Sequence, residues 1–173
     1  YIFNGYYLGD TKYYNSDGTS AKKWDKTTNE TLTAKWTSSA VKTPIPTRTG
    51  YHYMGWSTSK SGTGEIAGDY TPTQDITLYA IWQDNIKPSG TIVANPSNWT
   101  NGNVIITATG EDNGSGLKKL EILNEKGTVV ASTINKTLSY TDTSEGIEQY
   151  TARITDNAGN QYTVSTTDYI DRV

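Results

Sequence analysis

The feature that most constrains the fold of this chain is a pair of motifs that occurs twice. Tyr1-Ile-Phe-Asn-Gly-Tyr-Tyr7 and Tyr51-His-Tyr-Met-Gly-Trp-Ser57 share the pattern aromatic–x–aromatic–x–Gly–aromatic. A second motif follows each of them, first Thr31-Leu-Thr-Ala-Lys-Trp36 and later Thr77-Leu-Tyr-Ala-Ile-Trp82. The first motifs are 50 positions apart (1 to 51) and the second are 46 apart (31 to 77), so the loop is longer in the first copy. Two matched ends around a variable loop indicate duplication of one supersecondary unit.

Each copy has the pattern of two strands joined by a loop. Alternation places Tyr51 and Tyr53 on one face of the first strand, and Gly55 permits a bulge or close backbone packing. Apolar residues recur at period two over 76–82, which predicts the second strand. The Ser-Gly-Thr-Gly of 61–64 is typical of a turn between them. The sequence therefore predicts two small β-modules.

The composition agrees with an all-β chain of several thin modules. Tyr (13), Trp (5) and Gly (16) are plentiful, Phe and Met occur once each, and the mean hydropathy is -0.65. A net charge of -3 argues against electrostatic binding to nucleic acid or to an anionic membrane. The chain has no Cys and one His (His52), which excludes Cys-ligated zinc and thiol catalysis and argues against a Ser-His-Asp triad. No apolar run approaches the ~20 residues of a membrane-spanning helix, so we expect no membrane insertion.

After Trp82 the pattern changes to short strands separated by turns. Residues 83–90, with Asp84 and Pro88, have the composition of a linker. The rest of the chain has roughly the ~100 residues of an immunoglobulin-type sandwich, which we expect to have seven strands. Six of these strands are predicted from alternation and turn residues: Thr91–Ala94, Asn103–Thr109, Leu117–Leu123, Thr128–Ser132, Glu148–Thr155 and Gln161–Thr166.

The second copy, from Pro46 through Trp82, resembles the Listeria–Bacteroides repeat, the B-repeat module of internalin-type surface proteins. The resemblance rests on the Gly-Tyr-x-aromatic-x-Gly-Trp start and the Thr-Leu-Tyr-Ala-x-Trp end. The first copy departs from it, with Tyr6 where Trp is usual and Thr33 in place of Tyr. The resemblance implies β-grasp-like modules: an N-terminally truncated, degenerate repeat at 1–36 and a fuller one at 37–82.

Residues 83–173 resemble a bacterial Ig-like module of Gram-positive surface proteins. The stretches that carry the resemblance are Asn95-Pro-Ser-Asn-Trp-Thr-Asn-Gly-Asn-Val104, Glu111-Asp-Asn-Gly-Ser-Gly116 and Arg153-Ile-Thr-Asp-Asn-Ala-Gly-Asn160. The expected fold class is thus all-β, with two small β-grasp-like repeat modules and an Ig-like β-sandwich. Both resemblances imply non-catalytic parts of secreted, often wall-anchored proteins.

Two turns of the sandwich are candidates for a Ca²⁺ site. Asp112 and Asn113 open one turn, and Asp156 and Asn157 open another, so each offers carboxylate and carbonyl oxygens. Asp, Asn and Gly are also the residues that tight turns require, and neither stretch has EF-hand spacing. Turn chemistry is the preferred interpretation, and no cofactor is expected beyond this candidate Ca²⁺.

Exposed aromatic residues of the first copy are candidates for contact with a glycan or a protein partner. Tyr6, Tyr7 and Trp24 lie among further tyrosines (Tyr13, Tyr14), and aromatic rings with polar neighbours can hold a sugar face. The tryptophans at repeat-matched positions are instead expected to pack in module cores. Those tryptophans are Trp36, Trp56 and Trp82.

The resulting hypothesis is a stalk or adhesion segment of a bacterial cell-surface protein, located outside the cell or on its wall. We expect no enzymatic activity, since no catalytic site is visible, and the acids lie mostly in turns. We expect partners among surface proteins or glycans, and none among nucleic acids. The alternative hypothesis is a carbohydrate- or cell-wall-binding accessory module of a secreted enzyme. In either case the chain is expected to be a piece of a longer repeat-bearing protein.

Overall fold

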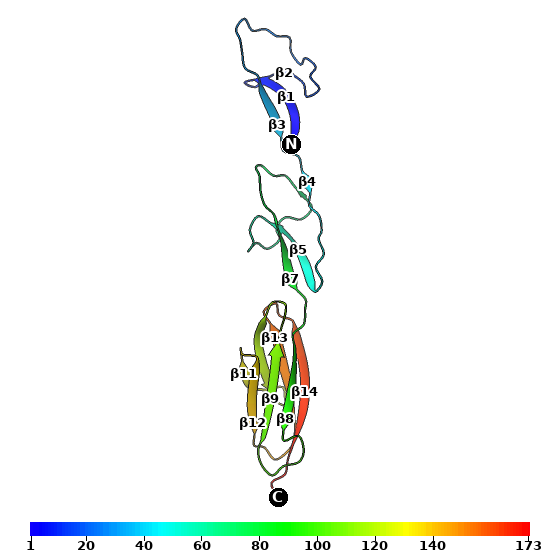
Figure 1. The fold of residues 1–173 in the computed structure, drawn as a ribbon, viewed down its shortest axis with the longest axis vertical. Coiled ribbons are helices and arrows are strands. Elements are labelled where there is room, and N and C mark those ends of the chain that lie inside the picture. The colour runs from blue at the N-terminus through cyan, green and yellow to red at the C-terminus, as the bar shows by residue number, and fades with distance from the viewer. The chain divides into compact units, whose positions relative to one another are not determined.

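The computed structural model describes residues 1–173, which form fourteen β-strands and no helix (Figure 1). The predicted all-β fold class is therefore confirmed. The chain divides into two compact units, Tyr1–Pro46 with Met54–Ile81, and Thr47–Tyr53 with Trp82–Val173. The strands are β1 Ile2–Leu8, β2 Thr11–Tyr14, β3 Thr33–Thr37, β4 Val41–Lys42, β5 Tyr51–Ser57, β6 Asp69–Tyr70, β7 Tyr79–Asp84, β8 Ser89–Asn95, β9 Val104–Glu111, β10 Leu117–Leu123, β11 Val129–Thr133, β12 Thr137–Asp142, β13 Gly146–Asp156 and β14 Gln161–Ile170.

The strands that precede the sandwich form three small sheets. One has the order β2-β1-β3, and the other two pair β4 with β6 and β5 with β7. The second strand of the later copy begins at Tyr79, so the expected start at Ile76 is wrong. Ile76 is 42% exposed and lies outside any strand. The alternating apolar residues thus begin in the loop before β7, which is why the predicted strand started too early.

The first motifs of the two copies adopt the same unusual backbone conformation at their glycines. Gly5 has a φ of +119°, and a Cβ there would lie 2.1 Å from the Tyr14 carbonyl oxygen. Gly55 has a φ of +135°, and its Cβ would lie 2.1 Å from the Gly64 carbonyl oxygen. Both positions therefore need glycine for the φ and for the close approach of a neighbouring backbone. The sequence match between the copies extends to their three-dimensional structure.

The matched aromatic residues also pair in equivalent ways. The rings of Phe3 and Trp36 are 4.8 Å apart in the first copy, and those of Tyr53 and Trp82 are 5.6 Å apart in the second. These tryptophans are less buried than expected. Trp36 is 58% exposed, so its assignment to a module core is wrong, and Trp56 and Trp82 are only half-buried. A sheet of two or three strands is too narrow to enclose an indole on all sides.

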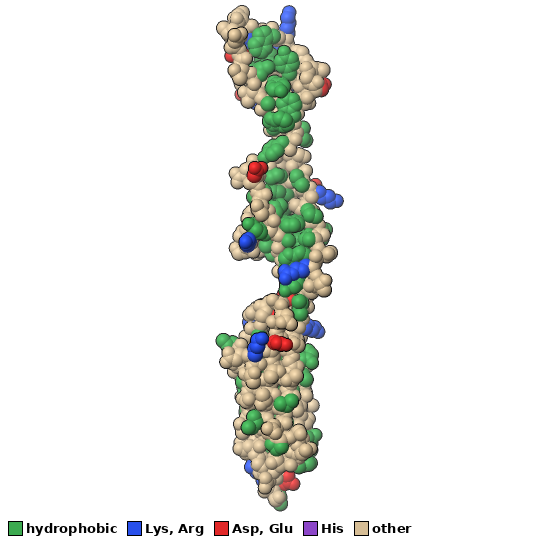
Figure 2. All heavy atoms as spheres, viewed as in Figure 1, with side chains coloured by type: hydrophobic (Ala, Val, Ile, Leu, Met, Phe, Trp, Pro, Cys, Tyr) green, Lys and Arg blue, Asp and Glu red, His purple; other side chains and the backbone are tan.

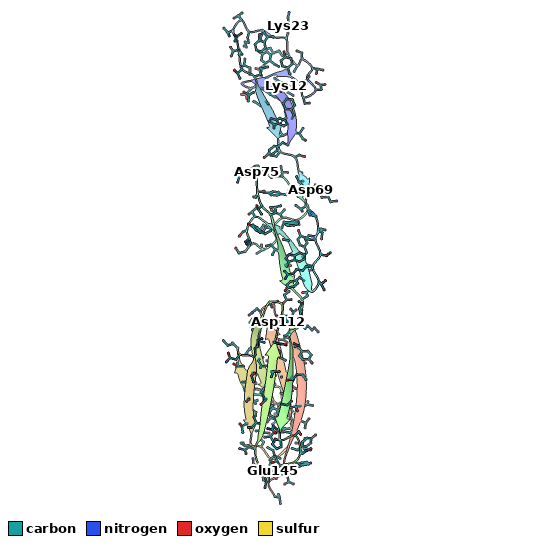
Figure 3. The ribbon with its side chains drawn as sticks, viewed as in Figure 1. Lys12, Lys23, Asp69, Asp75, Asp112 and Glu145 are labelled. Carbon is teal, nitrogen blue, oxygen red and sulfur yellow. The ribbon has the colours of Figure 1, made fainter.

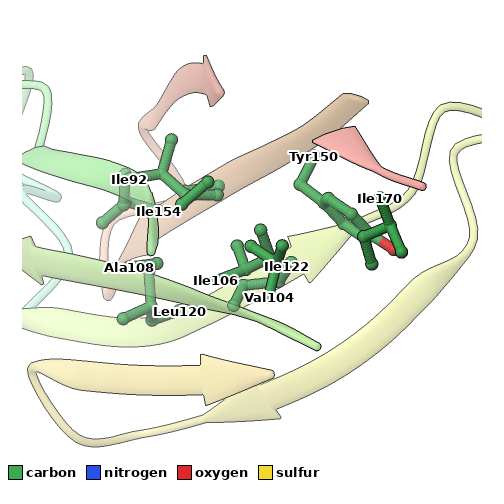
Figure 4. Close-up of a cluster of buried hydrophobic side chains, with 11 residues drawn as sticks. Ile92, Val104, Ile106, Ala108, Leu120, Ile122, Tyr150, Ile154 and Ile170 are labelled. Atoms are coloured by element: carbon green, nitrogen blue, oxygen red, sulfur yellow. The ribbon is translucent and has the colours of Figure 1, made fainter. Parts of the chain in front are cut away.

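The remaining strands form a seven-stranded sandwich, as the sequence predicts. One sheet has the order β11-β10-β13-β14, and the facing sheet has the order β12-β9-β8. Side chains alternate between the core and the solvent along each strand, most clearly in β9. The inward residues form one cluster (Figure 4): Ile92, Ala94, Val104, Ile106, Ala108, Leu120, Ile122, Tyr150, Ala152, Ile154 and Ile170.

Two parts of the sandwich differ from the sequence-based prediction. Strand β12 was not predicted, although its register with β9 is continuous from Thr137↔Thr109 to Asp142↔Val104. The predicted linker at 83–90 is part of the fold. Asp84 is buried, and the Asn85 amide donates to the Gly50 carbonyl at 2.9 Å. Polar residues that suggested a linker are thus used to anchor the start of the sandwich.

Candidate functional site

Three aspartates meet at one end of the sandwich, the end where Asp112 is labelled in Figure 3. Asp84 is the last residue of β7, Asp112 follows β9, and Asp156 is the last residue of β13. One carboxylate oxygen from each lies within 4.8 Å of the other two. Asp84 and Asp156 are buried and Asp112 is half-buried. We call these three residues the aspartate cluster.

Backbone amides satisfy most of the cluster's oxygens. The Asp84 carboxylate accepts from the amides of Ile86 (2.9 Å) and Ser115 (2.6 Å). Oδ2 of Asp112 accepts from the next two glycine amides of its turn, at 3.0 and 2.7 Å. The Asp156 carboxylate accepts from Asn160 twice, from its amide (2.7 Å) and its side-chain nitrogen (2.8 Å). The Ser115 bond joins the Asp84 segment to the Asp112 turn, and the Asn160 side chain, which also donates to the Asp84 carbonyl at 3.0 Å, joins it to the Asp156 turn.

Electrostatics of the cluster follow from these bonds. The amide of Ile86 is the largest of the influences that lower the pKa of Asp84, and Ser115 and the positive charge of Arg48 add to it against the opposing effect of burial. Five of the six carboxylate oxygens accept a hydrogen bond, and the sixth, Oδ1 of Asp112, is buried without a partner. Chemically, the cluster fixes the turns, and its open oxygen lies where a hard cation such as Ca²⁺ would find carboxylate ligands.

The structure brings together only part of the residues proposed for Ca²⁺ from the sequence. Asp112 and Asp156 belong to the cluster. Asn113 is exposed, and the side chain of Asn157 donates to the Ser115 carbonyl at 3.0 Å instead. Asp84 was not predicted as part of this site. The sequence around it gives no sign that its side chain contacts turns about 30 and 70 residues further along the chain.

The aromatic candidates of the first copy separate into three environments. Tyr6 and Tyr14 are directly opposite each other on β1 and β2 and are 43% and 38% exposed. With Gly18 and Leu32 they line an open hollow of about 400 Å³. The ring of Tyr7 lies outside this hollow, with the Lys35 ammonium 4.7 Å from its centroid. A cation–π contact thus occupies one face of Tyr7.

Trp24 packs on a tyrosine that is not exposed at all. Tyr13 is 1% exposed, and its ring lies 5.1 Å from that of Trp24, so its expected place among exposed aromatics is wrong. Its hydroxyl donates to Asp25 at 2.5 Å, and the Lys22 ammonium binds the same carboxylate at 2.6 Å. These bonds, that of Lys22 foremost, lower the pKa of Asp25 to about 2. Trp24 covers this cluster while remaining 40% exposed.

The geometry defines a chain of small, aromatic-paired β-modules followed by a β-sandwich. The Listeria-Bacteroides repeat domain family matches residues 11–81, which covers most of both copies. A solved structure of fibronectin(III)-like modules of CbhA from Clostridium thermocellum is also similar, with 17% identity, a TM-score of 0.45, and coverage of 81% of this chain and 83% of that one. That similarity is too low to bear on function. A comparison with curated proteins finds no match. No helix of this protein is long and apolar enough to cross a membrane.

Proposed function

We propose that the chain is a non-catalytic, extracellular segment of a bacterial cell-surface protein that spaces or presents other domains and contacts protein partners. Residues 1–36 and 37–82 are its two successive repeats, of the internalin B-repeat type, and 83–173 is its Ig-like module. The observation that carries the proposal is the repeat itself: the family matches 11–81, and both copies reproduce the same glycine conformation and aromatic pair. Tandem modules that fold locally suit a spacing role.

The solvent faces of the sandwich support the same role. Hydroxyl side chains pair across neighbouring strands, with 2.8 Å between Thr91 and Thr109 and 2.9 Å between Thr151 and Ser165. Figure 2 shows few hydrophobic side chains on the visible face of the sandwich. Paired hydroxyls keep the solvent face of these strands hydrated where they lie.

The spacing role is tested in the protein that carries this segment, displayed on its native cell. Deleting residues 1–173 should reduce the access of an antibody to the flanking domain, because that domain would lie closer to the cell wall. An unrelated tandem of β-modules of similar length should restore access. If only the native segment restores antibody access, its role is specific binding rather than spacing, and the proposal is wrong.

A second candidate function is binding of a carbohydrate, as in an accessory module of a secreted enzyme. The hollow lined by Tyr6 and Tyr14 favours it, since two exposed phenol rings about an open space of about 400 Å³ can stack on a pyranose and hydrogen-bond its hydroxyls. In Figure 2 hydrophobic side chains gather on the visible face of the first module.

Matched tyrosine variants test this second candidate. Soluble peptidoglycan fragments and host-type glycans would be titrated into the ¹⁵N-labelled chain, with chemical shifts followed by NMR. Carbohydrate binding in the hollow predicts shifts at Tyr6 and Tyr14 that Y6A abolishes and Y7A leaves, because Lys35 already covers the Tyr7 ring. An absence of shifts with every glycan would dismiss this candidate and leave the spacing role intact.

A further inference from the structure

Two further aspartates are buried at the other end of the sandwich, the end where Glu145 is labelled in Figure 3. Asp142 is the last residue of β12, and Asp168 lies near the end of β14. Each is only 1% exposed. Because β12 and β14 belong to different sheets, the two carboxyl groups face each other across the interior of the sandwich.

Two oxygens of this pair, one on each aspartate, lack a hydrogen-bond donor. Oδ1 of Asp142 accepts from the Ser144 amide at 2.9 Å, but Oδ2 of Asp142 and Oδ2 of Asp168 are both buried without a donor. The two carboxyl groups are close enough for each to influence the ionisation of the other. Two carboxylates cannot hydrogen-bond unless one of them is protonated. A single proton held between them would supply the donor that both open oxygens lack.

The groups around the pair do not neutralise its charge. From β13, Tyr150 lies close enough to Asp142 to affect its ionisation, and Glu148 lies directly opposite Asp168 with its own Oε2 buried and unpartnered. From β12, Tyr140 packs on Tyr150 with 5.5 Å between ring centroids. Strand β9 contributes the apolar Val104 opposite Asp142.

The arginine that follows β14 at this end is engaged elsewhere. Arg172, which follows β14, donates to the side chain of Asn103 at 2.9 Å and to the Thr143 carbonyl at 3.1 Å. No ion pair joins it to either buried aspartate. A second negative charge on the pair would therefore be left without a counterion inside the sandwich.

We propose that Asp142 and Asp168 form a proton-binding pair that holds the two sheets together at this end in mildly acidic surroundings and weakens the sandwich when both groups ionise. The device is independent of the spacing role, since it belongs to the interior of one unit. Its effect is to make the stability of the sandwich respond to the pH outside the cell.

The pKa directions agree with this geometry. Burial, followed by the adjacent Asp142, raises the pKa of Asp168 to about 6. Burial acts in the same direction on Asp142, but its bonds with Ser144, Tyr150 and Asp168 outweigh it and leave its pKa below the ordinary value. In the pH range where the unfolded carboxyl groups are ionised, the folded pair therefore keeps one proton.

The sign of the pH effect follows from linkage. Between the ordinary aspartate pKa of 3.8 and about 6, the folded chain binds a proton at Asp168 that the unfolded chain does not. The stabilisation from this proton is complete below about pH 4 and is lost as the pH rises through about 6. Over that window the unfolding equilibrium constant should increase about tenfold per pH unit.

The test uses urea unfolding of the full chain at pH values between about 4 and 8, followed by the indole N–H signal of Trp99. That indole packs on Tyr169 at the same end of the sandwich, with 5.5 Å between ring centroids. In D168N, an amide replaces the protonated carboxyl and can still donate to Asp142, so the pH dependence between about 4 and 6 should disappear. D171N changes an exposed neighbouring acid and should follow the wild type.

The ionisation of Asp168 can also be followed directly in the wild type. The ¹³C carboxyl signal of Asp168 in the wild type should titrate near pH 6, a result that does not depend on any variant folding. A wild-type sandwich whose stability is flat from pH 4 to 6, or a D168N chain that keeps the wild-type slope, would overturn the proposal. Stabilisation by CaCl₂ at pH 7.5 that D168N abolishes would overturn it too, because the pair would then hold a cation.

Discussion

The sandwich and the first unit bury their side chains in different ways. Seven hydrophobic side chains of the sandwich are completely inaccessible: Val104, Ile106, Ala108, Leu120, Ile122, Ala152 and Ile154. In the unit formed by residues 1–46 and 54–81, Tyr13 is the only buried hydrophobic residue. The sandwich is held by an aliphatic core between two sheets, whereas the repeat modules are held by backbone contacts and partly exposed aromatic pairs.

The repeat modules therefore stay folded without an aliphatic core of their own. A glycine lets two backbones approach each other closely, and a single ring contact then covers the strand pair. Because a two- or three-stranded module gains little from apolar burial, each of these few contacts matters more than a single contact in the sandwich. The two units should therefore respond to different kinds of substitution.

The largest expected effect is loss of a core isoleucine in the sandwich. Ile106 is 0% exposed and its neighbour Ile105, on the solvent face of the same strand, is 47% exposed. Ile106→Ala should lower the free energy of unfolding of the sandwich by about 2–5 kcal/mol, because it leaves a cavity. Ile105→Ala, the matched control, should cost under about 1 kcal/mol. Urea unfolding measures both, and equal losses would mean that the aliphatic core does not dominate this unit.

The next largest effect is expected at the glycine shared by the repeats. Gly55→Ala places a Cβ 2.1 Å from the Gly64 carbonyl oxygen at a φ of +135°. The strained backbone alone should cost about 1–3 kcal/mol, and the clash adds to it. Gly68→Ala is the matched control, because Gly68 has a φ of +84° but open space around its Cβ position. NMR signals of β5 should weaken or shift in the first variant and persist in the second.

If the repeats are structurally equivalent, Gly5→Ala should damage the first copy as Gly55→Ala damages the second. Its Cβ would lie 2.1 Å from the Tyr14 carbonyl oxygen. A first copy that tolerates alanine at this position would contradict the equivalence of the two modules.

Alternation and turn residues were enough to place most of the sandwich strands. Strand β10 coincides with its predicted bounds, Leu117–Leu123, because its apolar residues and flanking glycines are unambiguous. Strand β12 was missed because its sequence, Thr-Leu-Ser-Tyr-Thr-Asp, is mostly polar and only two of its residues alternate as apolar. Its strand conformation comes from pairing with β9, which is a tertiary effect that local sequence does not contain.

The candidate sites were only partly predictable for the same reason. The turns at Asp112 and Asp156 could be found because Asp-Asn followed closely by Gly marks tight turns. Asp84 and the pair Asp142–Asp168 could not, since each becomes special only through partners that the packing of two sheets brings to it. Likewise, the repeat predicted which tryptophans are equivalent, but it could not reveal how thin modules leave them exposed.

A smaller effect is expected from the aspartate cluster. Asp84→Asn replaces an acceptor of two amide hydrogen bonds with a group that also donates, so it should destabilise the sandwich by about 1–3 kcal/mol. Glu111→Gln, at an exposed acid beside the cluster, should have no measurable effect.

Performing these unfolding titrations with Ca²⁺ and with EDTA separates the two uses of the aspartate cluster. Hydrogen bonding alone predicts the same difference between wild type and Asp84→Asn in both solutions. A bound cation would enlarge that difference in Ca²⁺. An Asp84→Asn chain as stable as the wild type in both solutions would show that the cluster does not fix the turns.

The smallest expected effect is a loss of stability of the first module at acid pH. The bonds from Lys22 and Tyr13 lower the pKa of Asp25 to about 2, so the first module should lose their stabilisation as the pH falls from about 4 towards 2. Over that range the contribution of Asp168 to the sandwich is already complete. Tyr13→Phe removes one donor to Asp25 and should move the acid transition of Trp24 fluorescence to higher pH. Asp10→Asn, at a fully exposed acid, should leave that transition in place, and a shift as large as that of Tyr13→Phe would assign it to general charge rather than to this contact.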